Sequence, residues 1–180
     1  MQTTSRARTV IFAIVGAIGI TLALIGIGPS PTRAQQPIPP ILLEPLTPRS
    51  AFTDDVRGQF RIKLEGHGTN VVNMHDPSNT LVAKITVQPG AQFPWHTHPG
   101  AVIVNVAQGE LVYVPASDCM ERSYPAGTAF VDPGHGHVHT AFNPTDEVTV
   151  MYATFFEVPA VGPLTITEGV EAPADCQVGP

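Results

Sequence analysis

The fold of this chain is decided by two short stretches, Pro94-Trp95-His96-Thr97-His98-Pro99-Gly100 and Gly136-His137-Val138-His139-Thr140-Ala141-Phe142-Asn143. In an extended segment side chains alternate between two faces, so His96 and His98 are expected on the same face. Neutral imidazoles are good ligands for divalent transition metals, and His139 from another strand would add a third. The spacing therefore predicts a pocket for one divalent transition metal ion, with Zn, Mn, Fe, Ni and Cu all left open.

The residues around these histidines follow a regular pattern. Residues 90–109 fit G-x5-H-x-H-x10-G, and residues 127–143 fit G-x5-P-x2-G-x2-H-x3-N. These patterns resemble the paired motifs of the cupin superfamily, G-x5-H-x-H-x3-E-x6-G and G-x5-P-x-G-x2-H-x3-N. The resemblance covers roughly residues 81–156, about half of the chain. It implies that His96, His98 and His139 are the metal ligands.

The sequence departs from the cupin pattern in two places. Val102 stands where the family has its metal-binding glutamate, and the segment between Pro133 and Gly136 is one residue longer than the pattern. The resemblance therefore implies a three-histidine site without a carboxylate, with Val102 facing the pocket. Such a site leaves more positions for water or substrate, and the bound ion keeps its full double charge. A small anionic ligand is expected.

The remaining candidates near the motifs carry weaker predictions. His137 shares a face with His139 in an extended chain, which favours either an extra ligand or a residue of the second shell and pocket wall. The Gly134-His135-Gly136 turn that precedes His137 leaves the direction of the His137 side chain open. The alternative to a metal site is that His96 and His98 form a surface pair and that His139 has a structural role. Three polar residues flank the motifs without a predicted place in the pocket: Asp132, Glu110 and Tyr113.

Short apolar segments between turn residues predict strands over 60–64, 81–87, 102–106, 110–114, 128–131 and 148–156. The pair 102–106 and 110–114 flanks a Gln108-Gly109 turn, which predicts a hairpin. No segment after the N-terminal apolar run has helical periodicity, so the composition predicts an all-β fold. The cupin resemblance narrows this fold to a double-stranded β-helix, or jelly-roll barrel, with the metal inside one end.

Residues 1–34 predict an N-terminal signal peptide. Arg6 and Arg8 precede an apolar run over 10–27, and Thr32-Arg33-Ala34 is typical of a cleavage site. The run exceeds the usual hydrophobic region of about 7–15 residues and approaches the ~20 residues that span a bilayer. A retained membrane anchor is therefore the alternative. Both interpretations place the folded domain outside the cytoplasm, secreted or periplasmic.

The rest of the chain predicts one domain. Residues 35–50 are proline-rich and predict no regular structure, as a linker or as an arm across the barrel. Residues 51–180 predict a single cupin-like barrel with a C-terminal tail. From Gln35 onward fifteen acidic residues face six Lys and Arg. This acidic balance excludes nucleic acid as a partner.

The two cysteines predict an intramolecular disulfide. In an oxidising compartment, two cysteines in one small domain usually pair. Cys119 lies in a polar loop and Cys176 in a Pro/Ala/Gly-rich tail, so the bond would fasten the tail to the barrel. Closing a loop of this length stabilises the fold by roughly 4 kcal/mol. A redox pair or a pair of thiolate metal ligands is the alternative.

The sequence leaves three alternative functions open. The first is a metal-dependent enzyme, which the resemblance implies as a dioxygenase, isomerase or lyase acting on a small anionic molecule. The second is a non-catalytic protein that binds or senses a metal or small molecule, and the third is a structural role without metal. Outside the cytoplasm no reduced cofactor is supplied, which favours a reaction that needs no external reductant. The sequence names neither the substrate nor the oligomeric state, and a homodimer stays open.

Overall fold

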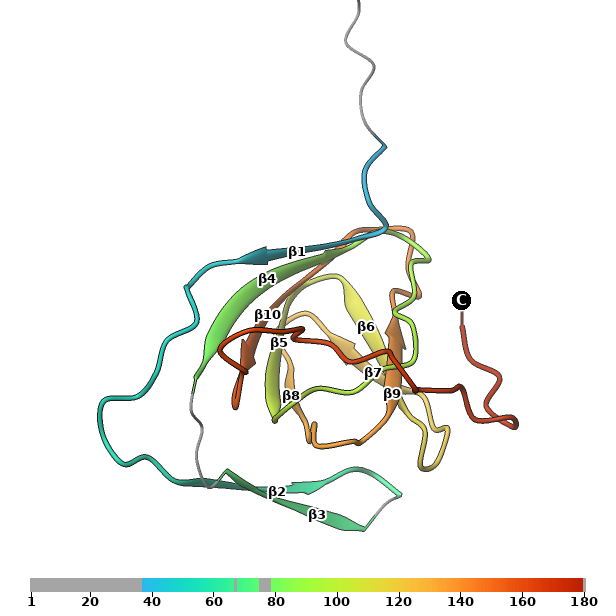
Figure 1. Cartoon of the computed structure of the whole chain (residues 1–180). Helices are drawn as coiled ribbons and strands as arrows, with labels where there is room; N and C mark the ends of the chain where they lie inside the picture. The colour runs from blue at the N-terminus through green and yellow to red at the C-terminus, as the bar shows by residue number, and fades with distance from the viewer. Residues whose placement is uncertain (1–36, 67, 75–78, 180) are drawn as a thin grey trace, which may run out of the picture. The chain divides into compact units, whose positions relative to one another are not determined.

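The computed structural model describes residues 37–66, 68–74 and 79–179 (Figure 1). Within these residues the chain forms ten β-strands and no helix, which confirms the predicted all-β fold. Consequently no described segment is a helix of the length and apolarity that crossing a membrane requires. The signal peptide or anchor predicted over residues 1–34 lies outside the described residues, so it stays a prediction.

The strands form two larger antiparallel sheets and one separate pair. The five-stranded sheet has the order β1 (Ile41–Pro45), β4 (Leu81–Val87), β10 (Thr149–Phe155), β5 (Val102–Gln108) and β8 (Ala129–Asp132). The three-stranded sheet has the order β7 (Arg122–Pro125), β6 (Glu110–Pro115) and β9 (His139–Phe142). The pair is β2 (Gly58–Lys63) with β3 (Thr69–Met74).

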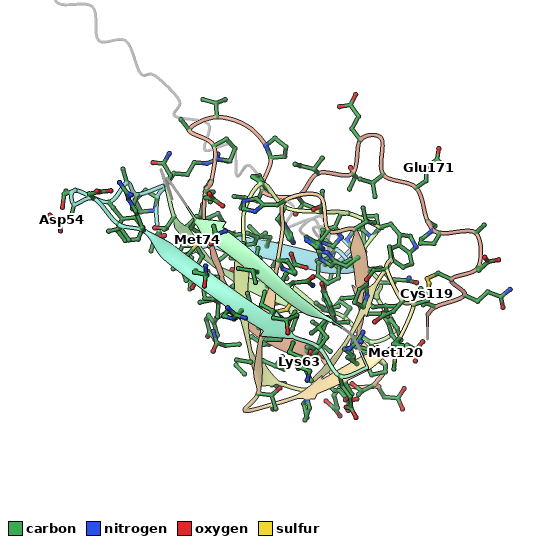
Figure 2. All side chains as sticks on the ribbon, turned by 90° about the horizontal axis from the view of Figure 1, so that it is seen from below. Asp54, Lys63, Met74, Cys119, Met120 and Glu171 are labelled. Carbon is green, nitrogen blue, oxygen red and sulfur yellow. A yellow bond between two sulfur atoms is a disulfide. The ribbon has the colours of Figure 1, made fainter. Side chains whose placement is uncertain are left out.

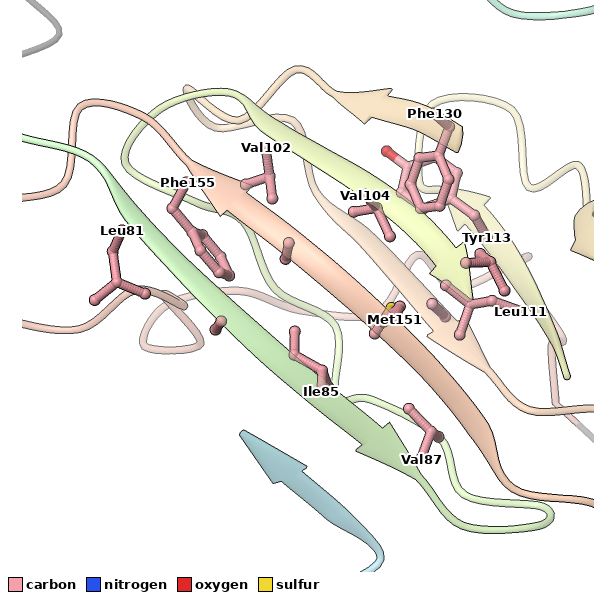
Figure 3. Packing of buried hydrophobic residues seen from close by; sticks show 14 of the residues in the cluster. Leu81, Ile85, Val87, Val102, Val104, Leu111, Tyr113, Phe130, Met151 and Phe155 are labelled. Carbon is pink, nitrogen blue, oxygen red and sulfur yellow. The ribbon is translucent and has the colours of Figure 1, made fainter. Parts of the chain in front are cut away.

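The two larger sheets share one hydrophobic core. Strict alternation along β4 and β10 buries every second side chain, as a sheet with one covered face requires. Leu111 and Tyr113 of the three-stranded sheet pack into the same cluster as Ile85 and Met151 of the five-stranded sheet (Figure 3). Burying one Leu or Ile side chain contributes about 1.5–3 kcal/mol. The core between the sheets therefore holds the barrel together and surrounds the site described below.

The predicted hairpin between 102–106 and 110–114 is wrong, although both strands exist. β5 pairs with β10 and β8, whereas β6 pairs with β7 and β9. The chain crosses from one sheet to the other at Gly109, whose φ is 72°. A Cβ atom there would lie 2.8 Å from the Thr149 hydroxyl oxygen and 2.9 Å from the Val148 carbonyl oxygen. Glycine is needed at this corner for both its backbone angle and its size.

The prediction of no regular structure over residues 35–50 is wrong for β1. Ile41–Pro45 pairs antiparallel with β4, and Ile41 lies opposite Val87. β1 is an edge strand, and an edge tolerates proline because the missing N–H need not face a neighbour. Pro40 lies immediately before the strand and Pro45 at its end, so the residues between them keep their N–H groups.

The C-terminal tail, which is the part of the chain after β10, is attached to the three-stranded sheet. The predicted disulfide is present between Cys119 and Cys176, with a Cα–Cα distance of 5.5 Å and a separation of 57 residues. Figure 2 shows Cys119 beside this tail. Trp95 and Val178 pack against a small apolar cluster made by Val112, Val114 and Phe142. The tail is thereby held both covalently and by apolar contacts.

Candidate metal centre

The three predicted ligands come together between the two larger sheets. His96, His98 and His139 each offer one ring nitrogen, and these nitrogens lie within 4.8 Å of one another. All three side chains are buried, with exposed fractions of 4 %, 8 % and 4 %. Transition ions bind imidazole nitrogens at about 2.0–2.1 Å. Two nitrogens on one ion are at most about 4.2 Å apart, so shifts of a few tenths of an ångström would let the three rings share one ion.

The backbone places the histidines in two ways. His139 begins β9, and His96 faces it across an isolated bridge in which each backbone N–H donates to the other residue's carbonyl at 2.9 Å. Thr97 forms the next bridge, with Ile166 of the tail. His96 and His98 line the same cavity, as period-2 alternation predicts, although they belong to no regular strand.

Each imidazole is oriented through its Nδ1 atom. The oxygen partners of these atoms are Pro94 O at 2.7 Å from His96, Leu164 O at 2.8 Å from His98 and Asp132 Oδ2 at 2.9 Å from His139. A carbonyl or carboxylate beside Nδ1 favours the tautomer that donates from this atom. The lone pair then lies on Nε2, which is the arrangement that a metal-binding histidine needs.

Burial keeps His96 and His98 neutral. Desolvation, followed by the charges of His139 and His98, lowers the pKa of His96 to about 3. Desolvation also lowers the pKa of His98 from its usual value. Only a neutral imidazole binds a metal, so protons compete weakly with an ion at these two rings near pH 7.

Asp132 is a buried carboxylate beside His139. Its Oδ2 accepts hydrogen bonds from the Tyr113 hydroxyl at 2.7 Å and from His139, and its Oδ1 accepts one from Gly134 N at 2.7 Å. Burial alone would raise the pKa of Asp132, but the attraction of His139 and the hydrogen bonds from His139 and Tyr113 hold it well below its usual range. Burial and the neighbouring carboxylate raise the pKa of Tyr113 well above its usual value. The carboxyl is therefore ionised and the phenol protonated.

The three rings face a small cavity with a volume of about 60 Å³. Its walls are mostly apolar and include Ile85, Phe93, Val104, Leu111, Phe130, Met151 and Phe155. Tyr113, Asp132 and Thr165 of the tail add the other polar groups. None of the described residues that line it is a lysine or an arginine. Any negative charge on a bound molecule would have to be balanced by a metal ion.

Val102 lies beside the predicted ligands. It is 2 % exposed and lies at the start of β5 (Figure 3), and it lines the same cavity as the three histidines. Its Cα partner on the neighbouring strand β8 is Asp132. The position at which the cupin pattern has a carboxylate is thus an apolar wall, and a carboxylate stands directly across from it.

The His137 side chain does not line the metal cavity, so it is neither the extra ligand nor the wall residue that the sequence suggested, but its carbonyl contacts His139. Its side chain is exposed and lines a separate surface pocket. Gly134, His135 and Gly136 have φ values of 61°, 50° and 83°, and three successive left-handed residues interrupt the alternation of faces. Only the His137 carbonyl comes near the site, 3.3 Å from His139 Nδ1.

The other polar residues named from the sequence divide into one outside the cavity and two inside it, and two residues of the tail were not predicted at all. Glu110, a flanking candidate, accepts a hydrogen bond from the Ser123 hydroxyl and does not line the cavity. Tyr113 and Asp132 do line it, and only their closeness to the motifs pointed to them. Leu164 and Thr165 belong to the tail and carry no sequence signal.

The central part of the chain matches a known family. Residues 83–155 fit the family profile described as Cupin domain. The chain belongs to the cupin superfamily. The matched region of this cupin runs from β4 to the end of β10 and contains all three histidines. The match and the two facing sheets confirm the predicted double-stranded β-helix.

This cupin is also similar to individual proteins. (R)-mandelonitrile lyase from Granulicella tundricola is 32 % identical over 74 residues, which are 41 % of this chain and 56 % of the relative. The chain therefore spans little more than half the length of that curated relative. Two solved structures are a cupin-like protein from Thermotoga maritima, with 30 % identity over 42 % of this chain and 55 % of that chain and a TM-score of 0.38, and an oxalate oxidase, with 26 % identity over 48 % and 45 % and a TM-score of 0.41.

Proposed function

We propose that this cupin binds one divalent transition metal ion at His96, His98 and His139. The observation that carries the proposal is that all three histidine rings share the same two features. Each is buried, and each has an oxygen acceptor at Nδ1 that leaves Nε2 for the ion. Three neutral imidazoles suit Zn, Fe, Ni or Cu, and the absence of a carboxylate ligand leaves open positions for a small molecule.

The function that we propose is an enzyme that acts on a small molecule with a carboxylate, enolate or carbonyl oxygen. The bound ion would polarise that oxygen. The apolar walls would exclude water, and the protonated Tyr113 hydroxyl would lie at the edge of the reacting group. Similarity to a lyase supports a bond-cleaving or bond-forming reaction that needs no external reductant.

The size of the cavity limits the substrate. An apolar cavity of about 150 Å³ binds benzene, whereas this one offers about 60 Å³. We therefore propose aliphatic substrates smaller than an aromatic ring, such as short 2-hydroxy acids, 2-oxo acids or aliphatic cyanohydrins.

A non-catalytic binding protein is the second candidate, and one observation favours it. Both oxygens of Asp132 already accept hydrogen bonds, three in all. The only carboxylate that lines the cavity is, among the described residues, therefore engaged and poorly placed to act as a general base. In this case the same site would bind a metal or a small acid for sensing or storage.

We further propose that the domain works outside the cytoplasm, secreted, periplasmic or tethered by an uncleaved N-terminal segment. The Cys119–Cys176 disulfide supports this location, because such bonds persist in oxidising compartments. Fractionation of cells that produce the full chain, followed by N-terminal sequencing, tests the location and the cleavage after Ala34 together. Cytoplasmic material with an intact N-terminus would contradict it.

Metal analysis tests the proposed centre. Protein purified without chelator or nickel resin should contain about one transition ion per chain, and His98→Ala should lose most of it. A four-ligand structural zinc site binds with about 10–16 kcal/mol, so one ligand is worth roughly 3–4 kcal/mol, or a few hundredfold in affinity. Exposed His137→Ala is the matched control and should keep its metal. Full occupancy in His98→Ala would refute the centre.

Turnover separates the two candidate functions. The loaded protein should convert at least one member of a panel of short hydroxy acids, oxo acids and aliphatic cyanohydrins, and aromatic analogues should react more slowly. Tight binding of a short carboxylate without turnover of any member would favour the binding protein instead.

A further inference from the structure

Asp132 presents an unusual electrostatic situation at the end of β8. Its side chain is almost fully buried, with 1 % exposure, and within the described part of the chain it forms no ion pair with lysine or arginine. Its partners are the Tyr113 hydroxyl, the Gly134 N–H and the His139 ring. A buried carboxylate is costly unless it is compensated by an opposite charge. Of these three groups, only His139 would connect Asp132 to the positive charge of a bound metal ion.

The position of Asp132 relates it to the missing glutamate. Val102 and Asp132 are direct Cα partners in the antiparallel β5–β8 pair, and both line the cavity. Side chains at directly opposed positions have Cβ atoms about 4.5–5.5 Å apart and share a face of the sheet. The carboxylate of this site thus lies on the strand next to the position of the family glutamate, where it contacts a metal ligand.

We infer that Asp132 is the positioning residue that replaces the family glutamate, because it holds His139 in its ligating tautomer and supplies the negative charge of the centre from outside the ligand shell. This inference rests on the proposed metal site. The carboxylate fixes the proton of His139 on Nδ1, at a distance of 2.9 Å, and directs Nε2 toward the cavity. A position next to the ion stays free for substrate, while the ion–ligand unit remains compensated.

Two variants separate the charge of Asp132 from its hydrogen bonds. Asp132→Asn keeps the size of the side chain and removes the charge, and we expect metal affinity to fall about 10- to 100-fold, as is typical for partners of ligating histidines. Tyr113→Phe removes one hydrogen bond to the same Oδ2 atom and leaves the charge, so we expect less than a threefold change. The measurement is competition with a chromophoric chelator. Equal losses in both variants would overturn the assigned role and indicate a general packing defect.

A double variant tests the replacement directly. Val102→Glu should raise metal affinity in the Asp132→Asn background by well over tenfold, and in the wild-type background by only about tenfold, because two carboxylates would face each other across the strands there. The Co²⁺-loaded proteins add a spectroscopic readout, because the visible absorption should shift in Asp132→Asn and not in Tyr113→Phe. Additive effects of the two substitutions would mean that Asp132 does not take the place of the glutamate.

The histidine tautomer gives a test that needs no variant. In the Zn²⁺-loaded wild-type protein, ¹⁵N–¹H correlation spectra of the imidazoles should show that His139 carries its proton on Nδ1 and binds the ion through Nε2. Binding of the ion through Nδ1 would overturn the inference even if Asp132→Asn failed to fold. Failure of the metal centre itself is recognised separately, because wild type would then bind no ion and His98→Ala would change nothing.

Discussion

His139 and His98 face the same cavity but are supported by different parts of the molecule. His139 begins a regular strand, and its Nδ1 is bound by Asp132 at the end of β8, within the barrel. His98 lies in an irregular segment, and its Nδ1 is bound by Leu164 O, 66 residues away in the tail. Leu164 also lies beyond the region that matches the cupin family, residues 83–155. One half of the site is therefore completed by the barrel and the other by the tail.

The first prediction concerns the covalent attachment of this tail. Replacing Cys119 and Cys176 by serine should lower the free energy of unfolding by about 4 kcal/mol, from the loop-closure entropy of a bond that spans 57 residues. Metal affinity should change much less, because Leu164 is held near His98 by backbone hydrogen bonds between Thr97 and Ile166. Urea unfolding and chelator competition measure the two quantities. A large loss of metal affinity with little loss of stability would show that the disulfide supports the His98 side of the site more than the fold.

The second prediction targets the bridge that holds Leu164 in place. Ile166→Pro removes the N–H that donates to Thr97 O at 2.8 Å, so the acceptor of His98 loosens. Metal affinity should fall roughly tenfold or more, as for loss of an outer partner of a ligand. Val161→Pro, at a side chain that is 91 % exposed, is the matched control in the same tail. If both proteins bind metal like wild type, His98 does not depend on the tail.

The third prediction adds a ligand on the barrel side of the site. Val102→Glu should place a carboxylate beside the three histidines and tighten metal binding about tenfold, or roughly 1.4 kcal/mol. The extra negative charge should also weaken the binding of small carboxylates. Competition with a chromophoric chelator gives the first value and calorimetry with a short acid the second. Unchanged metal affinity in a folded variant would show that a side chain at position 102 does not reach the ion.

The fourth prediction is the smallest and concerns pH. Burial lowers the pKa of His96 from 6.5 to about 3, so below pH 6.5 the unfolded chain binds a proton that the folded metal-free chain does not. This stabilising contribution is complete above pH 6.5 and is lost as pH falls toward 3, by at most about 1.4 kcal/mol per pH unit for one group. Urea unfolding of chelator-treated protein between pH 7.5 and 5.5 measures it, and His96→Gln should flatten the slope. Rising stability on acidification would contradict the burial of this ring.

The sequence predicted those parts of the molecule that depend on local pattern. β4 has the predicted bounds, and His96 and His98 share a cavity because alternation needs only an extended backbone. His137 was misplaced because three left-handed residues precede it, and their combined effect on direction does not follow from glycine content alone. The hairpin failed because a turn signal does not specify which sheet receives the next strand.

Other parts of the site had no local signal at all. The contact between His98 and Leu164 joins segments 66 residues apart, and no periodicity links them. Asp132 was visible only as a charged residue near a motif, and its role depends on the strand register that places it opposite Val102. β1 was hidden by its prolines, which favour irregular structure in composition but are compatible with an edge strand.

Those same prolines affect how copies of this protein meet one another. An exposed sheet edge with free N–H and C=O groups is a template on which a second chain can add a strand and begin to polymerise. β1 forms one edge of the five-stranded sheet, and it is short, with Pro40 immediately before it and Pro45 at its end. Leu42 and Leu43 are partly exposed on this strand, so its surface alone would attract a neighbour. A brief, proline-bounded edge limits how far an intermolecular hydrogen-bond ladder can extend, and so disfavours edge-to-edge association of copies.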